Sequence, residues 1–326
     1  MRVLIVAVIL AVLASCAPAP PITAFPPPPT QPPPTLVPSA AFTPLPAPAA
    51  TLIPTPFPTP THFPTHFCQP QALVLPGHFL LSRPIPVDGR QRIEPSYRYG
   101  ATAGGSKEIH HGVEMLNAGG TPVLAAADGL VLFAGPDSGT LFGPHADFYG
   151  NLVVLAHELP GVGMPIYTLY AHLSEVHAAE GQVVQRGDWI GDVGLTGVAA
   201  GTHLHFEVRT DAYDYDATRN PDLWLGPLTG EGDEQTGAIA GYVLDPYGEV
   251  LTLQGITIEP QNGYKIFLEP YQDETVNGDD DWGENFAVGE LPPGWYTLTV
   301  VYGTVYKIEV EVLPGQLTLV PVCLDQ

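Results

Sequence analysis

The sequence predicts an all-β protein in which an antiparallel β-sheet domain is followed by a small β-sandwich. Short apolar runs with strand-like composition recur between Gly- and Pro-rich turns from residue 67 to the end of the chain. No long segment shows the 3.6-residue apolar period of an amphipathic helix. The length that remains after a proline-rich N-terminal region suits two domains of ordinary size.

Residues 1–15 have the composition of a secretory signal peptide. An uninterrupted apolar run, 3–14, follows Arg2 and is too short to span a bilayer. The end of the run, Leu13-Ala14-Ser15-Cys16, resembles the lipobox of bacterial lipoproteins. This resemblance implies cleavage before Cys16 and a lipid anchor there. The alternative is an ordinary signal peptide in which Cys16 is incidental, and both interpretations place the mature protein outside the cytoplasm.

The lipidated Cys16 is expected to lead into a linker, 16–66, that cannot form a hydrophobic core. Residues 17–66 contain 19 of the 38 prolines and no Asp, Glu, Lys or Arg. Proline favours the extended polyproline II conformation, so the linker can reach on the order of 150 Å from the membrane. A passive spacer and a glycosylated stalk fit the same composition.

The predicted first domain, 67–228, contains a pair of histidines with strand spacing. Because side chains alternate along a strand, His203, His205 and Glu207 share one face. The apolar residues Leu204, Phe206 and Val208 lie on the other face, which a core would bury. Two imidazoles that face one point suggest a metal site.

A second pair of metal ligands occurs earlier in the chain. His110 and Glu114 are four positions apart, just before a turn-rich, strand-like run over 121–135. Together with His205 they supply two nitrogens and one carboxylate. Catalytic zinc sites use such a set of three ligands and leave the fourth position to water.

Several ordered blocks resemble the lysostaphin-type (LytM-domain) zinc endopeptidases over roughly 110–226. The blocks are His110-His111-Gly112-Val113-Glu114, Tyr170-Ala171-His172-Leu173-Ser174 and Gly201-Thr202-His203-Leu204-His205-Phe206-Glu207. The resemblance implies a barrel-sandwich-hybrid sheet and a zinc ion held by His110, Glu114 and His205. It also implies that His172 and His203 act on the attacking water and the developing oxyanion. The family motif has Asp where this chain has Glu114, which is one methylene longer.

The resemblance implies a zinc metalloendopeptidase that cleaves peptide bonds in peptidoglycan stems or cross-bridges. The N-terminal signal and lipobox place this activity at the outer face of the cell membrane. One alternative is a non-catalytic module that binds the wall or activates an amidase, and another is a peptidase acting on free proteins. His111, His145, His157 and His177 are interpreted as structural or solvated residues. The loop 135–149 is expected at the rim of the substrate groove, and Tyr97 or Tyr99 can add a hydroxyl group to the site.

A linker, 229–236, separates the predicted second domain, 237–326, from the first. Strand-like runs occur at 238–244, 265–268, 296–301, 307–312 and 317–322, with turns at 245–248 and 292–294. The segments Gly237–Val243 and Leu291–Tyr296 resemble carboxypeptidase-regulatory-like, transthyretin-like sandwiches. That resemblance implies an accessory or adhesive module without catalytic groups.

The charge of the chain is strongly negative, −23 in total. Residues 231–326 hold 17 Asp and Glu against two Lys, a net charge of −15. Such a field repels nucleic acid and anionic lipid, so the expected membrane contact is the lipid anchor alone. The run Asn277–Asp281 can offer oxygen ligands to calcium, but a solvated acidic loop is the favoured interpretation because no ligand-spaced motif is present.

Two cysteines remain once Cys16 is assigned to the lipid. Cys68 lies at the entry to the first domain and Cys323 lies almost at the end of the chain. They can pair as a disulfide in an exported protein, or they can be two separate thiols, because their separation cannot be read from the sequence.

Overall fold

The computed structural model describes residues 71–230, 234–252 and 255–324. The predicted signal peptide, Cys16, the proline-rich linker and Cys68 lie outside the described residues. The all-β prediction is confirmed, since the described chain contains nineteen strands and two short 3₁₀ turns, η1 (Tyr215–Ala217) and η2 (Pro221–Leu223). None of these elements is a helix with the length and apolarity needed to cross a membrane.

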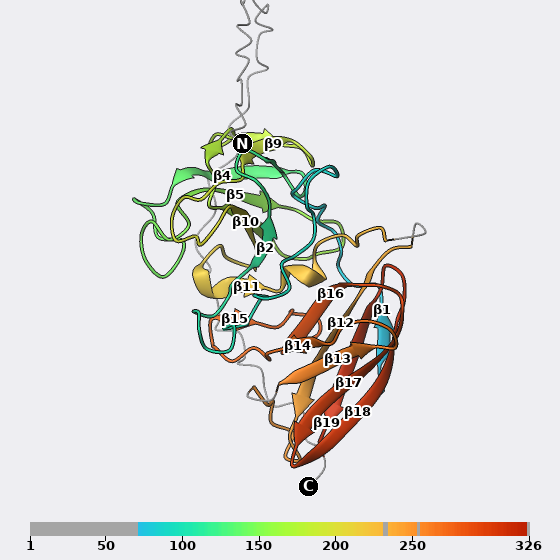
Figure 1. The fold of residues 1–326 in the computed structure, drawn as a ribbon. Helices are drawn as coiled ribbons and strands as arrows, with labels where there is room; N and C mark the ends of the chain where they lie inside the picture. Colours follow the sequence, from blue (N-terminus) through green and yellow to red (C-terminus); the bar gives the residue numbers. More distant parts are fainter. Residues whose placement is uncertain (1–70, 231–233, 253–254, 325–326) are drawn as a thin grey trace, which may run out of the picture. The chain divides into compact units, whose positions relative to one another are not determined.

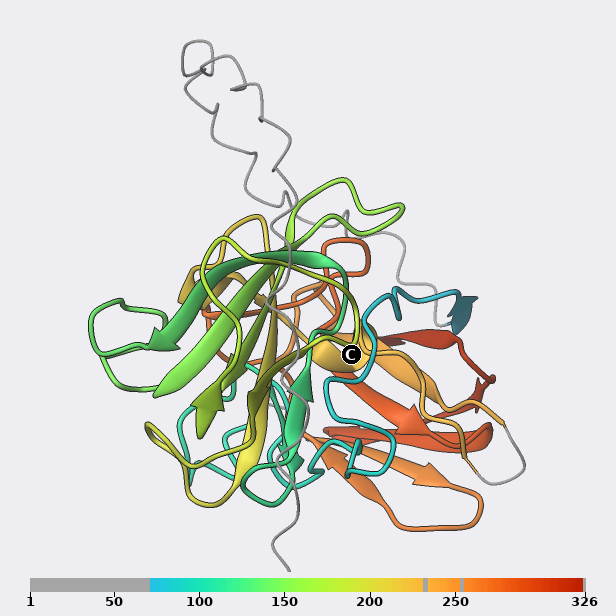
Figure 2. The ribbon, with the colours of Figure 1, turned by 90° about the horizontal axis from the view of Figure 1, so that it is seen from above.

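An eight-stranded sheet carries the residues of the predicted metal site. Its strands from β4 to β10 lie side by side, coloured green to yellow, in Figures 1 and 2. The hydrogen-bonded order is β15-β11-β10-β6-β5-β4-β8. Strand β11 pairs with the C-terminal part of β10, and β2 pairs with its N-terminal part, residues 203–206. The bounds are β2 (Val113–Leu116), β4 (Gly129–Pro136), β5 (Asn151–His157), β6 (Ile166–Ala171), β8 (Val183–Val184), β10 (His203–Thr210), β11 (Thr218–Arg219) and β15 (Val276–Asn277).

Strand β10 shows why this sheet is stable. Leu204, Phe206 and Val208 are fully buried in the core, as their alternation predicts. The opposite face of β10 is also buried, although it carries His203, His205 and Glu207. Buried polar groups need hydrogen-bond or charge partners inside the protein, because solvent does not reach them. This face of β10 is therefore expected to carry a network of polar contacts.

A smaller sheet and its turns flank the eight-stranded one. It has the order β3-β9-β7, formed by β3 (Pro122–Leu124), β7 (Glu175–Val176) and β9 (Trp189–Asp192). Val123 and Ile190 from this sheet join the same core as Leu204. The loop predicted at 135–149 begins two residues later than expected, because β4 continues to Pro136.

The C-terminal region forms two four-stranded sheets (Figure 1) with the orders β1-β19-β12-β16 and β14-β13-β17-β18. A second core cluster contains residues of both sheets, including Ile239, Phe286 and Leu298. The five predicted strands occur with small shifts at their ends, and β1, β13, β15 and β16 add to them. The bounds are β1 (Leu73–Leu75), β12 (Gly237–Leu244), β13 (Ile256–Pro260), β14 (Ile266–Leu268), β16 (Phe286–Leu291), β17 (Gly294–Tyr302), β18 (Thr304–Val312) and β19 (Leu317–Cys323).

Contacts between the two regions are extensive within the described chain. The core cluster that contains Val113 and Phe206 also contains Ala240 and Leu317 from the C-terminal sheets. Strand β1, which precedes the metal-site region in the sequence, pairs with β19 in an antiparallel register. Cys323, at the end of β19, is disulfide-bonded.

Candidate metal centre

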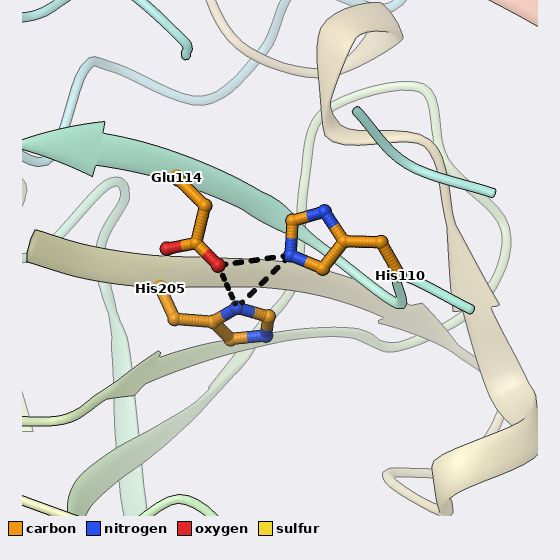
Figure 3. Close-up of side chains that lie close together, drawn as sticks. All are labelled: His110, Glu114 and His205. Carbon is orange, nitrogen blue, oxygen red and sulfur yellow. Dashed lines mark hydrogen bonds and ion pairs between the residues drawn. The ribbon is translucent and has the colours of Figure 1, made fainter. Parts of the chain in front are cut away.

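Three side chains from separate parts of the chain converge on one point in Figure 3. Glu114 comes from β2, His205 comes from β10, and His110 lies just before β2. The antiparallel register of β2 and β10 places Glu114 directly opposite His205. His110 Nε2 lies 3.0 Å from Glu114 Oε1 and 3.3 Å from His205 Nδ1, and the third distance, His205 Nδ1 to Glu114 Oε1, is 3.2 Å.

The donor atoms fit a zinc ion. At bond lengths of about 2.0–2.1 Å, tetrahedral ligands lie roughly 3.3 Å apart, close to the separations seen here. The outer ring nitrogens of both histidines already have acceptors: His110 Nδ1 faces the Tyr97 carbonyl at 2.9 Å, and His205 Nε2 faces Glu207 Oε1 at 2.9 Å. When the outer nitrogens carry the ring protons, the inner nitrogens have lone pairs that point toward one another and toward the carboxylate oxygen of Glu114. These lone pairs repel one another, and a cation bound between them stabilises the arrangement.

The electrostatics of the three groups agree with such a site. Burial lowers the pKa of His110, which keeps its ring neutral. Burial opposes ionisation of Glu114, but the charge of His205 and the close contacts of the carboxylate with His110, His203 and His205 outweigh it and hold the pKa of Glu114 well below its usual range. Burial also opposes the charge on His205, and the Glu114 carboxylate overcomes it and raises the pKa of His205 to about 9. Positive charge is therefore favoured at this point.

His172 and His203 lie beside the cluster. The ring centroid of His172 is 4.9 Å from that of His203 and 5.6 Å from that of His205. His172 Nδ1 faces the Thr196 carbonyl at 2.8 Å, and burial lowers the pKa of His172 to about 3. His203 Nδ1 faces the Gly201 carbonyl at 2.7 Å, and its Nε2 lies 2.6 Å from Glu114 Oε2. The structure thus brings together all five residues predicted from the sequence.

A buried network behind His205 was not predicted as part of the site. Glu207 Oε1 accepts hydrogen bonds from His205 and from the Tyr149 hydroxyl, and Glu207 Oε2 lies 2.7 Å from Arg209 Nε. Arg209 also donates to the Phe142 carbonyl. The sequence does hold a signal for this network, because Glu207 and Arg209 continue the face of β10 that carries His203 and His205.

The tyrosine hydroxyls predicted as candidates point elsewhere. Tyr97 stacks on His110 with ring centroids 4.0 Å apart, but its hydroxyl donates to the Glu108 carbonyl. Tyr99 is buried, and its hydroxyl donates to the Thr218 carbonyl. Tyr97 therefore shapes the site through its ring and its main-chain carbonyl.

The other histidines have structural contacts. His111 is buried against the Tyr215 ring, with centroids 3.8 Å apart, and His157 Nε2 lies 2.7 Å from the Thr168 hydroxyl. His177 is partly exposed and lies 2.9 Å from an Asp192 carboxylate oxygen. His145 contacts the edge of Phe148.

The acidic run Asn277–Asp281 differs from the solvated loop that the sequence favours. Asp279 is buried, with Oδ1 3.0 Å from His78 Nε2, and Asp280 lies 2.8 Å from Arg219. Asp281 is exposed, and its carboxylate lies 3.7 Å from His78 Nε2. Charge density in this segment is thus compensated by partners from the first region rather than by water alone.

Residues 108–217, which contain the whole cluster, match the model of peptidase family M23. The chain therefore contains an M23 peptidase domain. A domain of this kind is a zinc metallopeptidase, and His110, Glu114 and His205 are its candidate metal ligands.

The relatives of the M23 domain include hydrolases and an activator. The DD-carboxypeptidase/endopeptidase Mpg of Neisseria meningitidis serogroup B is 42% identical over 31% of this chain and 20% of that protein. The murein hydrolase activator NlpD of Salmonella dublin is 35% identical over 38% of this chain and 27% of that protein. The chain thus spans about a fifth to a quarter of the length of these relatives. The catalytic domain of lysostaphin from Staphylococcus simulans is similar at 26% identity and a TM-score of 0.32, over 40% of this chain and 88% of that one.

Proposed function

We propose that the protein is a zinc-dependent endopeptidase that hydrolyses peptide bonds in the stems or cross-bridges of peptidoglycan at the outer face of the cell membrane. The observation that carries the proposal is the convergence of His110, Glu114 and His205, with His172 and His203 beside them. The M23 match and the resemblance to a DD-carboxypeptidase/endopeptidase support the reaction class.

The two remaining histidines have complementary roles in this proposal. Bound zinc would lower the pKa of water and polarise a carbonyl group. His172 stays neutral because of its lowered pKa, and its Nδ1 is held by Thr196, so its Nε2 lone pair is free to accept a proton from the attacking water. Both ring nitrogens of His203 face oxygens, so its Nε2 is placed as a donor that stabilises the oxyanion which develops on the scissile carbonyl.

A non-catalytic wall-binding or amidase-activating module is the second candidate, because a murein hydrolase activator is among the relatives. Both reactive histidines are present here, which favours catalysis. A peptidase that acts on free proteins is a third candidate, and the substrate comparison described next separates it from a wall hydrolase.

The test uses purified protein with zinc, wild type and His203→Ala, on purified peptidoglycan and on an unrelated protein substrate. We expect one zinc per chain in both proteins, release of wall peptides by the wild type, and a loss of roughly 100-fold or more in the variant. His177→Ala removes a histidine outside the cluster and outside the loop 135–149, and serves as the control. A wild-type protein that is loaded with zinc and yet inert on the wall would contradict the proposal.

The anchoring and the domain organisation are proposed from the sequence. We propose that lipid on Cys16 holds the protein at the membrane, that 67–228 and 237–326 are a peptidase and a transthyretin-like domain, and that Cys68 pairs with Cys323. The disulfide on Cys323 supports the pairing. Cys16→Ser should release the protein from the membrane fraction, and peptide mapping with and without reductant should detect the linked pair.

A further inference from the structure

A cavity of about 710 Å³ lies where residues 90–98 face the C-terminal sheets. The residues that line it and matter for its chemistry are Arg90, Arg92, Leu116, Tyr264 and Trp295. Its walls come from both regions of the chain, and none of the groups assigned to zinc or to catalysis lines it. The mechanism proposed above gives it no role.

Leu116 connects this cavity to the metal centre. It is the last residue of β2 and lies on the same strand face as Glu114, because the two are separated by two positions. In the pairing of β2 with β10, Leu116 lies directly opposite His203. Leu116 is also 36% exposed, so a chain bound across His203 would pass over it into the cavity.

The cavity concentrates positive charge in a chain that has little. The whole sequence has 11 Lys and Arg against 34 Asp and Glu, yet three arginines line this one cavity. Arg98 is paired with Asp222 at 3.1 Å, whereas Arg92 is 60% exposed and lies 4.0 Å from Glu290, which Arg83 already neutralises at 2.5 Å. Arg90 is exposed, and no ion pair of its side chain occurs within the described part of the chain. Glu94 is the remaining acidic residue of the lining.

Two exposed aromatic rings face the same cavity from the C-terminal sheets. Tyr264 is 95% exposed and Trp295 is 47% exposed. Rings of this kind have an apolar face and a polar edge, which makes them frequent anchors in binding sites. A ligand that covers these rings would remove their apolar surface from water, and this burial would favour binding.

The walls of the cavity are held at a fixed separation. Glu290, which lies in β16 and lines the cavity, accepts hydrogen bonds from the main-chain N–H of Ile93 and from Arg83. Strands β11 and β15 add a parallel pairing between the two regions. Arginines from one region and aromatic rings from the other are thus presented together, which lowers the entropic cost of binding.

We propose that this cavity is a substrate-binding extension of the metal centre that holds a carboxylate-bearing glycopeptide strand next to the scissile bond. This inference rests on the function proposed above. Sugar rings of the strand stack on Trp295 and Tyr264, and a free carboxylate pairs with Arg90 and Arg92. The C-terminal region therefore contributes directly to recognition of the wall polymer.

The test measures cosedimentation of the full-length protein with intact wall sacculi, with EDTA present so that nothing is hydrolysed. Trp295→Ala/Tyr264→Ala should weaken binding about tenfold, because aromatic rings that become buried on binding contribute much of the affinity of such surfaces. Arg90→Ala/Arg92→Ala should weaken it about fivefold, as expected for two partly exposed ion pairs. The matched controls are Tyr247→Ala, a 68% exposed ring outside the cavity, and Arg186→Ala/Lys307→Ala, which removes the same charge elsewhere.

Sacculi whose free carboxyl groups have been converted to amides test whether the arginines bind carboxylates of the wall. Wild type should bind them about fivefold more weakly, and the arginine double variant should lose nothing further. With zinc present, the cavity variants should raise KM on sacculi. Equal affinity of all variants for sacculi would overturn the inference, even if the wall is hydrolysed. Cavity-dependent binding without hydrolysis would instead support the inference and contradict the proposed endopeptidase.

Discussion

At the scale of single residues, Glu207 decides how His205 presents its nitrogen. The carboxylate holds His205 Nε2 at 2.9 Å, so Nδ1 is the atom that faces the metal centre. Glu207 is itself held by Arg209 and Tyr149, and all three side chains are almost fully buried. The charge of Arg209 and the contact with His205 outweigh burial and keep the pKa of Glu207 below its usual range. An ionised carboxylate in this position raises the basicity of the ligand.

Glu207→Gln should weaken zinc binding by roughly 10- to 100-fold, because the neutral amide holds His205 less well. It should also destabilise the fold by about 3–5 kcal/mol, because buried Arg209 loses its counter-charge. Chelator competition measures the first effect at a temperature where the variant is still folded, and urea denaturation measures the second. Glu180→Gln, on an exposed turn, is the control and should change neither value. Unchanged zinc affinity in a folded variant would show that His205 is oriented by other contacts.

The candidate ligands could be predicted because residue type and local spacing are enough to recognise a set of metal ligands. His110 and Glu114 are four positions apart, and His203 and His205 are two apart, so each pair has only a few geometries. The partners that orient them could not be predicted in the same way. The Tyr97 and Thr196 carbonyls that hold His110 and His172 are main-chain groups, which any residue type carries.

At the scale of elements, the turn around Gly197 supports the position of His172. Thr196, the residue before it, provides the carbonyl that binds His172 Nδ1 and a hydroxyl that accepts from the Asn151 N–H. Gly197 has a φ of +68°, and a Cβ there would lie 2.5 Å from the main-chain nitrogen of Gly150. The two segments approach so closely that only glycine fits.

Gly197→Ala should destabilise the protein by about 3 kcal/mol, of which about 1–2 kcal/mol is the cost of the left-handed backbone and the remainder is the clash. Gly120→Ala is the matched control, since Gly120 has a φ of +85° but open space around its Cβ position, and it should cost only about 1–2 kcal/mol. Urea midpoints compare the two variants. If they lost equal stability, the close approach to Gly150 would be irrelevant.

The strands of the first region follow from alternation and turn chemistry, whereas several pairings do not. Strand β1 has three residues and only an apolar composition, and its partner β19 is more than 200 positions away. Strand β15 has two residues and pairs in parallel with β11 of the other region. Short segments carry too little pattern to specify such long-range partners, so the shared core could not be predicted from the sequence.

At the scale of the whole molecule, the acidic C-terminal region buries some of its carboxyl groups. Glu284 is 1% exposed, and burial together with the nearby Asp279 raises its pKa to about 8. In the unfolded chain its ordinary pKa is 4.5. Between these two values the folded protein keeps a proton on Glu284 that the unfolded chain releases, so the free energy of unfolding falls as pH rises through this window.

Glu284→Gln should remove this pH dependence, because the amide does not titrate. The difference in unfolding free energy, wild type minus variant, should become more negative from pH 5 to pH 8, by at most about 1.4 kcal/mol per pH unit. Urea denaturation of both proteins across this range measures it, and carboxyl groups common to both cancel in the difference. A constant difference would mean that Glu284 is ionised in the folded protein at neutral pH.

The two regions are expected to unfold together, because one core cluster contains residues of both. Glu290→Ala tests this coupling. It removes a carboxylate of the C-terminal region that accepts hydrogen bonds from Arg83 and from the main-chain N–H of Ile93 in the first region. Arg83 has only 8% of its side chain exposed, so its loss of a counter-charge should cost about 3–5 kcal/mol. Glu311→Ala, on the exposed side of β18, is the control. Calorimetry should show a single transition in all three proteins, shifted to lower temperature as a whole in Glu290→Ala. Two transitions, of which only one moves, would mean that the regions are independent and that the cavity between Arg92 and Trp295 is not held at a fixed width.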